Sequence, residues 1–188
     1  MTDSARQRPL GRRQQFCSQC GHGLRVEIPA GDHQLRYTCN SCATVHYENP
    51  KLVVGCVPVH GDRILLCKRA IAPRLGYWTL PAGFMELGES MSEGAARETL
   101  EEACAKVVIE DLLASVNVLS AGQVHVFFRA ALPEPQFAAG AESLEVRLVT
   151  PEDIPWGELA FTSNRIALEQ FLLQRATDRR YVWTGNCI

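Results

Sequence analysis

Residues 78–105 read WTLPAGFMELGESMSEGAARETLEEACA. They predict the end of a strand, a tight loop containing Gly83, and a helix that is rich in alanine and acidic on one side. Glu98, Glu101 and Glu102 stand at i, i+3 and i+4, so their carboxylates share one helical face. Like charges at this spacing destabilise a helix by roughly 0.2–0.5 kcal/mol per pair unless a cation neutralises them. A hard divalent cation such as Mg²⁺ prefers carboxylate oxygens and accompanies phosphates, so this face predicts a metal site.

A solvated acidic helix face is the alternative interpretation, and the surrounding residues argue against it. The spacing G-x5-E-x7-R-E-x-x-E-E is that of the Nudix box, and its specified positions are filled by Gly83, Glu89, Arg97, Glu98, Glu101 and Glu102. Cys104 stands where the box has glycine, at a position that serves the exit of the helix and no metal ligand. The chain therefore resembles the Nudix hydrolases, which implies an α/β/α sandwich and metal-dependent hydrolysis of a pyrophosphate bond.

The same resemblance implies roles for individual residues. The expected ligands of a catalytic Mg²⁺ or Mn²⁺ are Glu98, Glu102, Glu101 and the backbone carbonyl of Ala82. Arg97 and Glu89 are expected to fix the loop against the helix. The alternative for this pair is an ordinary surface ion pair, which contributes little to stability.

The general base and the substrate contacts are less closely specified. Many Nudix enzymes use a glutamate outside the box as base, which makes Glu142 and Glu145 the candidates, although either also suits a solvated loop. Cations and aromatic rings could meet the phosphates and stack on a purine or flavin ring, although loops and cores hold such residues too. The candidates are Lys68, Arg69, Arg74, Trp78 and Phe84, with Tyr37, Tyr47 and Phe127 as further rings.

Four of the eight cysteines form two closely spaced pairs. Cys17-x-x-Cys20 and Cys39-x-x-Cys42 are separated by eighteen residues, which is typical of a structural four-cysteine zinc site. Two disulfides are the alternative, but nothing in the chain indicates secretion. The other cysteines show no paired spacing and are expected to be small buried hydrophobes or, near the end of the chain, a tail residue.

The chain divides by composition into four segments: a disordered basic tail (1–15), a zinc ribbon (16–48), a Nudix domain (49–176) and a C-terminal tail (177–188). The ribbon is too small to bury a core, so it should depend on its metal. Alternation and turn signals predict strands at 24–28, 34–38, 51–60, 63–69, 123–131 and 146–149, one or two strands over 106–119, a helix that begins near Ser90 or Ser92, and a second helix over 164–175.

The overall composition limits the kinds of binding partner that the chain can be expected to have. A net charge of −2 gives no general attraction to nucleic acid or to anionic membranes. Inside the ribbon the only cations are Arg25 and Arg36, so a structural or dimer-forming role is favoured over nucleic-acid binding. No apolar run approaches a membrane span and no signal-peptide core opens the chain, which predicts a cytoplasmic protein.

Outside the box, the chain is similar to the zinc-ribbon Nudix hydrolases that include the plant chloroplast FAD pyrophosphatase and ADP-ribose hydrolase. The shared stretches are NPKLVVG (49–55), LCKR (66–69), WTLPAG (78–83), ESLE (142–145) and LAFTS (159–163). This similarity implies cleavage of FAD to FMN and AMP, or of ADP-ribose to AMP and ribose 5-phosphate. A homodimer is expected from the resemblance alone.

Three alternatives remain for the activity. NADH diphosphatases also carry a ribbon, but they have an S-Q-P-W-P-F-P-x-S element that residues 106–131 lack. A hydrolase that sanitises nucleoside triphosphates is the second alternative. The third is a nucleotide-sensing regulator that binds nucleic acid through the ribbon, and the intact box carboxylates argue against it because a sensor does not need them.

Overall fold

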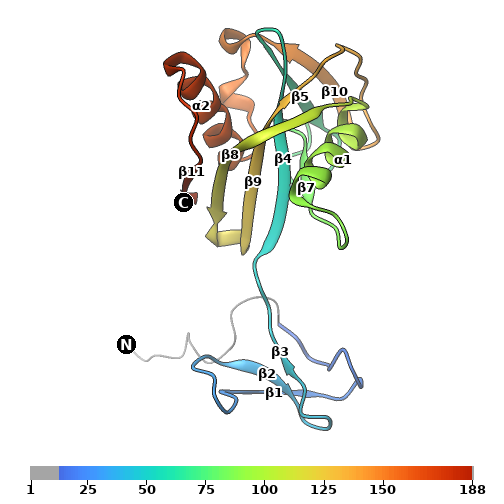
Figure 1. Ribbon diagram of the computed structural model, residues 1–188. Helices are drawn as coiled ribbons and strands as arrows, with labels where there is room; N and C mark the ends of the chain where they lie inside the picture. Colours follow the sequence, from blue (N-terminus) through green and yellow to red (C-terminus); the bar gives the residue numbers. More distant parts are fainter. Residues whose placement is uncertain (1–12, 188) are drawn as a thin grey trace. The chain divides into compact units, whose positions relative to one another are not determined.

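The computed structural model describes residues 13–187, so most of the basic tail predicted over residues 1–15 lies outside the described residues. The chain divides into two compact units, and the boundary falls between Pro50 and Lys51 (Figure 1). No helix in the described part of the chain is long and apolar enough to cross a membrane.

The first unit is a small antiparallel sheet. Its strands β1 (Leu24–Glu27), β2 (Arg36–Cys39) and β3 (Val45–His46) pair in the order β1-β2-β3. The turn after β1 is closed by the Asp32 amide, which donates to the carbonyl of Pro29, and Gly31 supplies its positive φ. The buried hydrophobic side chains among the described residues of this unit are Cys17, Tyr37 and Cys39, so apolar burial alone contributes little stability here.

The second unit is built on a mixed sheet. Its strands are β4 (Lys51–His60), β5 (Arg63–Arg69), β6 (Trp78–Thr79), β7 (Ala82–Phe84), β8 (Val108–Val118), β9 (Gln123–Ala131), β10 (Ser143–Val149) and β11 (Trp183–Cys187). The order is β10-β5-β4-β9-β8-β11, with β6 paired to β5 and β7 paired to β4. Strands β4 and β9 run parallel, as do β8 and β11, and the other pairs are antiparallel.

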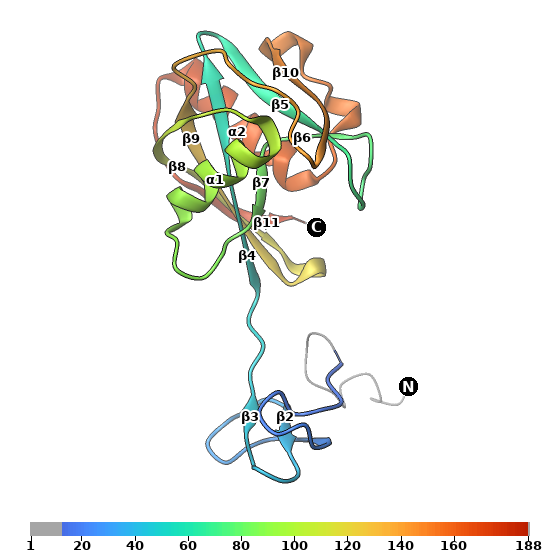
Figure 2. The ribbon, with the colours of Figure 1, turned by 90° about the vertical axis from the view of Figure 1, so that its right-hand side faces the viewer.

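Two helices cover opposite faces of this sheet. Helix α1 (Met91–Ala103) packs Ala95 against Val54 and Cys56 of β4. Helix α2 (Thr162–Thr177) packs in the cluster that holds Val57, which points to the other face because side chains alternate along a strand. Figures 1 and 2 show the two helices on opposite sides of β4 and β9. The predicted α/β/α sandwich is confirmed.

Helix α1 begins and ends where its sequence indicates. Ser90 is the N-cap: its hydroxyl accepts from the Glu93 amide, and the Glu93 carboxylate accepts from the Ser90 amide, which forms a capping box. Cys104 ends the helix at φ 49°, in the left-handed region, and its amide donates to the carbonyl of Leu100. The glycine of the box pattern would adopt this conformation without strain, and the cysteine adopts it with a β-carbon.

The structure differs from the sequence analysis at the C-terminal end. Within residues 177–188, expected to be a tail, Trp183–Cys187 form strand β11 and pair parallel with β8 from Ala114 to Val118. The sequence of this segment is WTGNC. Because glycine and asparagine are poor strand formers, no local pattern predicts a strand here. Strand β8 itself is continuous but irregular, with register shifts between Ile109 and Ala114 that account for the break expected there. Short 3₁₀ turns at Leu119–Ala121, Pro151–Asp153 and Trp156–Glu158 complete the unit.

Candidate active site

A cavity of about 1060 Å³ lies over the acidic face of α1. Its walls come from the loop after β5, strand β7, the β8–β9 connection, the loop before β10 and the beginning of α2. Segments far apart in sequence therefore converge on the Nudix box. The box residues that line the cavity are Gly83, Arg97, Glu98, Glu101 and Glu102.

Arg97 organises the loop and the helix. Its guanidinium forms a two-point ion pair with Glu89, with Nε 2.9 Å from Oε2 and Nη2 2.8 Å from Oε1. Its Nη1 donates to Glu98 at 2.8 Å and to Glu101 at 3.1 Å. Arg97 and the Glu86 amide hold the pKa of Glu89 down to about 2. Arg97 and Glu89 thus form a bidentate ion pair, a geometry that fixes direction as well as charge, and its role in orienting the site stays a prediction.

Glu98 and Glu102 are buried carboxylates, with residue exposures of 9% and 6%. Burial, reinforced by the neighbouring Glu98 charge, raises the pKa of Glu102 to about 8, against the Ala82 amide that donates to it at 3.2 Å. Burial also raises the pKa of Glu98, against the opposing charge of Arg97. Two buried acids facing one cavity are costly when ionised unless a cation balances them.

The residues present fit a divalent cation. The donor set offers oxygen ligands only, which suits Mg²⁺ or Mn²⁺. A β-carbon on Gly83 would lie 2.3 Å from the Glu98 carboxylate, so the glycine leaves the space above that carboxylate open. Ala82 lies on strand β7 directly beside it and lines the same cavity. That these groups bind the metal stays a prediction.

The two candidate bases lie in different surroundings. Glu142 lines the cavity, and its charge contributes to the raised pKa values of Glu98 and Glu102. Glu145 does not line the cavity and pairs with Arg147 on the partly exposed strand β10. The geometry therefore favours Glu142 over Glu145 as a residue that reaches the substrate.

The loop before β10 places Glu142 by binding the end of α1. Ala138 and Gly140 donate their amides to the carbonyls of Ala103 and Glu102, at 2.9 and 3.0 Å. These bonds satisfy helix carbonyls that have no partner within the helix. A β-carbon on Gly140 would lie 1.8 Å from the Glu101 carbonyl oxygen, so only glycine allows this approach.

The expected substrate contacts divide into two groups. Arg69 lines the cavity and is 9% exposed; its Nε donates to the Pro73 carbonyl and its guanidinium stacks on Phe161. No carboxylate among residues 13–187 forms an ion pair with it, so the cavity has a buried guanidinium in its wall. Phe84 and Arg74 also line the cavity.

The other expected contacts lie elsewhere. Trp78 is 4% exposed in the core, with the Lys68 ammonium over its ring, and neither residue lines the cavity. Phe127 is likewise in the core, and Tyr37 and Tyr47 belong to the first unit. Trp78 and Phe127 fill the core, which is the commoner role of aromatic side chains, whereas Tyr47 is largely exposed.

The far wall of the cavity could not be predicted from the sequence. It holds polar residues from the start of β9 and the start of α2, and one from β11: Gln123, His125, Thr162, Ser163 and Cys187. Residues 159–163 were noted only as a stretch of similarity, and nothing in the spacing of Gln123 and His125 marks them as cavity residues. Gln123 and His125 lie beside α2 only because of the order of the strands in the sheet.

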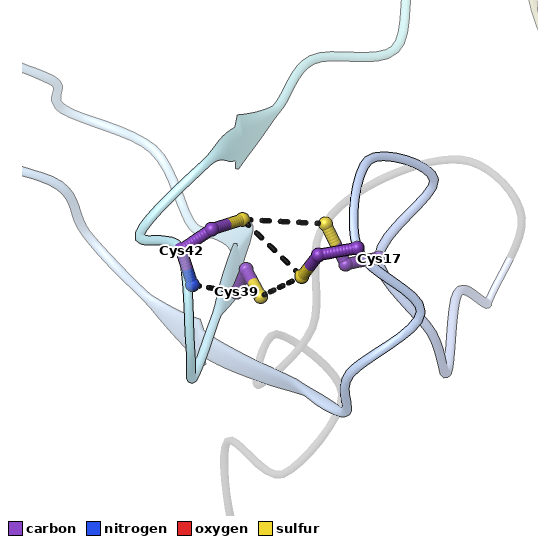
Figure 3. A group of neighbouring side chains, drawn as sticks. Cys17, Cys39 and Cys42 are labelled. Atoms are coloured by element: carbon purple, nitrogen blue, oxygen red, sulfur yellow. Dashed lines mark hydrogen bonds between the residues drawn. The ribbon is translucent and has the colours of Figure 1, made fainter.

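The four predicted zinc ligands converge in the first unit. Their sulfur atoms all lie within 4.8 Å of one another, with Cys17–Cys42 at 3.7 Å and Cys20 3.4 Å from both Cys39 and Cys42 (Figure 3). Sulfurs about 2.3 Å from a tetrahedral zinc are about 3.8 Å apart, so the cluster fits that ion with little adjustment.

Backbone amides support the same cluster. The Ser41 and Cys42 amides donate to the Cys39 sulfur at 3.3 and 3.4 Å, and the Gln19 amide donates to the Cys17 sulfur at 3.4 Å. Such donors stabilise thiolates that ligate a metal. All four cysteines are free, so the two disulfides of the alternative interpretation are not formed.

Comparisons with known proteins agree with this site. The family model described as NUDIX domain matches residues 49–176, and the one described as Nudix N-terminal, a zinc ribbon, matches residues 15–48. The NAD-capped RNA hydrolase NudC of Yersinia pestis is 36% identical over 94 residues, which are 48% of this chain and 33% of that protein. The chain thus matches about a third of the length of these curated relatives.

Solved structures give the same result. A NUDIX hydrolase from Nitrosomonas europaea is 46% identical, with a TM-score of 0.87 over 93% of this chain and 100% of that chain. An ADP-ribose pyrophosphatase from Streptococcus suis has a TM-score of 0.59 at 20% identity, over 73% of this chain and 100% of that chain, which shows the fold alone.

Proposed function

The chain belongs to the Nudix family, and from this membership we propose that it hydrolyses the pyrophosphate bond of a nucleotide that contains ADP. The observation that carries the proposal is one cavity lined by the buried carboxylates Glu98 and Glu102 and by the buried cation Arg69, which forms no ion pair among residues 13–187. Carboxylates hold a divalent cation and the guanidinium holds a phosphate, and both are needed where two linked phosphates bind.

In the proposed reaction, a water oxygen forms a bond to one phosphorus while the bond from that phosphorus to the bridging oxygen breaks. The bridging oxygen leaves with the electron pair on the second phosphate. Glu98, Glu101, Glu102 and the Ala82 carbonyl would hold Mg²⁺ or Mn²⁺, which neutralises phosphate charge and lowers the pKa of a bound water. Glu142 accepts the proton of the attacking water, because it is the glutamate outside the box that lines the cavity.

The chain's other residues orient these groups. Arg97, held by Glu89, fixes the carboxylates of Glu98 and Glu101. Arg69 binds the second phosphate, and its guanidinium is held by the Pro73 carbonyl and lies over the Phe161 ring. Orientation of this kind contributes to rate because the reacting groups are already in place.

We propose FAD or ADP-ribose as the substrate, with products FMN and AMP or ribose 5-phosphate and AMP. A cavity of about 1060 Å³ is large enough for a dinucleotide-sized ligand. The similarity to NudC favours a second candidate, cleavage of the NAD type of dinucleotide, although it covers less than half of this chain. Both share the ADP half and one cleavage chemistry.

The test is release of AMP from FAD, ADP-ribose, NADH and a nucleoside triphosphate, measured side by side with Mg²⁺, with Mn²⁺ and with EDTA. Metal-dependent cleavage that is fastest on FAD or ADP-ribose supports the proposal. Faster cleavage of NADH replaces it with the second candidate. Absence of cleavage of all four compounds contradicts the proposed activity.

A further inference from the structure

Three side chains on the far wall of the cavity form a hydrogen-bonded chain. The His125 imidazole on β9 lies between Gln123 of the same strand and Ser163 of α2. Its Nε2 is 2.8 Å from Gln123 Oε1, and its Nδ1 is 2.9 Å from Ser163 Oγ. His125 and Ser163 are 9% and 1% exposed, so the inner part of this chain is rigid and shielded.

The hydrogen-bonding capacity of each group fixes the direction of the chain. An amide oxygen only accepts, so His125 Nε2 carries the proton that is donated to Gln123. Burial lowers the pKa of His125 to about 4, so the ring is neutral and its Nδ1 is an acceptor. The Ser163 hydroxyl therefore donates to Nδ1.

The direction of these hydrogen bonds fixes the orientation of the Gln123 side-chain amide. Its oxygen is held by His125, and its Nε2, with two N–H donors, has no partner among residues 13–187. Val118 pairs with Gln123 across strands β8 and β9, and Val53 and Ala121 also line the cavity, so apolar side chains accompany the polar ones here. A neutral donor beside apolar side chains suits a planar ring with a carbonyl oxygen better than it suits a charged phosphate.

We propose that Gln123 is a specificity-determining residue that donates to a ring-side carbonyl oxygen on the second half of the substrate, with His125 and Ser163 as positioning residues. The inference rests on the proposed function and narrows it. Substrates whose second half carries such a carbonyl, as the flavin ring of FAD and the carboxamide of NADH do, use this donor. ADP-ribose has the same ADP half and no ring carbonyl, so it does not.

The experiment compares kcat and KM for FAD and ADP-ribose in the wild-type protein and in three variants. Gln123→Met keeps the length of the side chain and removes the donors. His125→Leu removes the bond that orients the amide. Gln34→Met is the matched control, because Gln34 is an exposed residue in the first unit.

We expect Gln123→Met to raise KM for FAD about tenfold, the effect of one lost hydrogen bond, with kcat nearly unchanged and ADP-ribose cleavage within about twofold of wild type. His125→Leu should show the same selective KM increase at a smaller magnitude, and Gln34→Met none. An equal rise in KM for both substrates would mean that Gln123 contacts the shared ADP half. An unchanged KM for both would mean that Gln123 does not contact the substrate. Either result overturns the inference. Failure of the proposed function is distinct, because the wild-type protein would then cleave neither compound.

Discussion

At the scale of single residues, the site depends on how Arg97 distributes its five donors. Four of its contacts are side-chain carboxylate oxygens, from Glu89, Glu98 and Glu101, and another is the carbonyl of Phe84 on the preceding loop. One guanidinium thus ties the loop, the helix and two expected metal ligands together. Lysine could not replace Arg97, because its ammonium group lacks the planar guanidinium that donates hydrogen bonds to two carboxylate oxygens at once.

The ion pair with Glu89 predicts a pH-dependent stability difference. The Glu89 pKa falls from 4.5 to about 2 in the folded protein, so the charged form stabilises the fold above pH 4.5 and the effect is lost as the pH falls toward 2. Denaturant unfolding at several pH values should find Glu89→Gln less stable than wild type at pH 7, with the gap narrowing below pH 4.5. A gap that is constant with pH would show that the carboxylate charge is not what stabilises the loop.

Substitution of the two candidate bases should have different effects on kcat. Glu142→Gln should lower kcat by about a hundredfold or more, as expected for loss of a general base, while KM changes little. Glu145→Gln, three residues further on in β10, is the matched control, and it should retain nearly full activity because Glu145 pairs with Arg147 outside the cavity. The reverse ranking of these two variants would exclude Glu142 as the base.

Residue-level prediction from the sequence succeeded where spacing along one helix fixes the geometry. Positions i, i+3 and i+4 place Glu98, Glu101 and Glu102 together in any α-helix, so no tertiary information is needed. Spacing says nothing about which side of a strand faces a cavity, so Trp78, a core residue, could not be told from Phe84, which lines the cavity.

At the scale of elements, the catalytic helix is held at both ends. The capping box fixes its N-terminus, and the loop before β10 binds its C-terminal carbonyls through the amides of Ala138 and Gly140. The same loop carries Glu142, so the position of the proposed base is coupled to the end of the helix that carries the metal ligands.

Gly140→Ala tests that coupling. The new β-carbon would lie 1.8 Å from the Glu101 carbonyl oxygen, so the loop must move away from α1 and take Glu142 with it. A displacement of about 1 Å can lower a rate by about a hundredfold, so we expect a loss of kcat near that size in steady-state assays. Gly157→Ala, where no atom lies within 4 Å of the new β-carbon, is the control. Normal turnover in Gly140→Ala would indicate that the loop does not position the base.

Element prediction was accurate for the strands and helices with clear patterns and failed for β11 and for the short strands β3 and β7, the second of which was expected to be a loop. Valines and other apolar residues predominate in β4 and β9, and capping residues mark α1, so local signals suffice there. Strand β11 exists because β8 offers it a free edge in parallel pairing, which is a tertiary reason that WTGNC does not encode locally. The far wall of the cavity was missed for the same kind of reason.

At the scale of the whole molecule, the two units have different sources of stability. The second unit has buried clusters on both faces of its sheet, whereas the first has three buried hydrophobic side chains among its described residues and a cluster of four sulfurs. We therefore expect the first unit to fold only with its zinc. The homodimer and the cytoplasmic location stay predictions.

Removal of zinc should affect one unit only. Treatment with a zinc chelator should make the amides of β1 and β2 exchange rapidly with solvent, while those of β4 and β9 keep their protection, as measured by hydrogen exchange. Metal analysis before and after treatment provides the control. Slow exchange in β1 and β2 after complete loss of zinc would contradict a structural role for the metal.

If buried carboxylates of α1 hold the metal needed to hydrolyse a pyrophosphate, then turnover of Glu102→Gln with saturating Mg²⁺ should reveal it. Glutamine keeps the shape of Glu102 and removes its charge, so we predict that kcat falls at least about a hundredfold while the free energy of unfolding does not decrease. Glu152→Gln, at an exposed position, is the control and should be unchanged. Turnover of a folded Glu102→Gln protein at the wild-type rate would contradict a role for the Glu102 carboxylate in holding the catalytic metal.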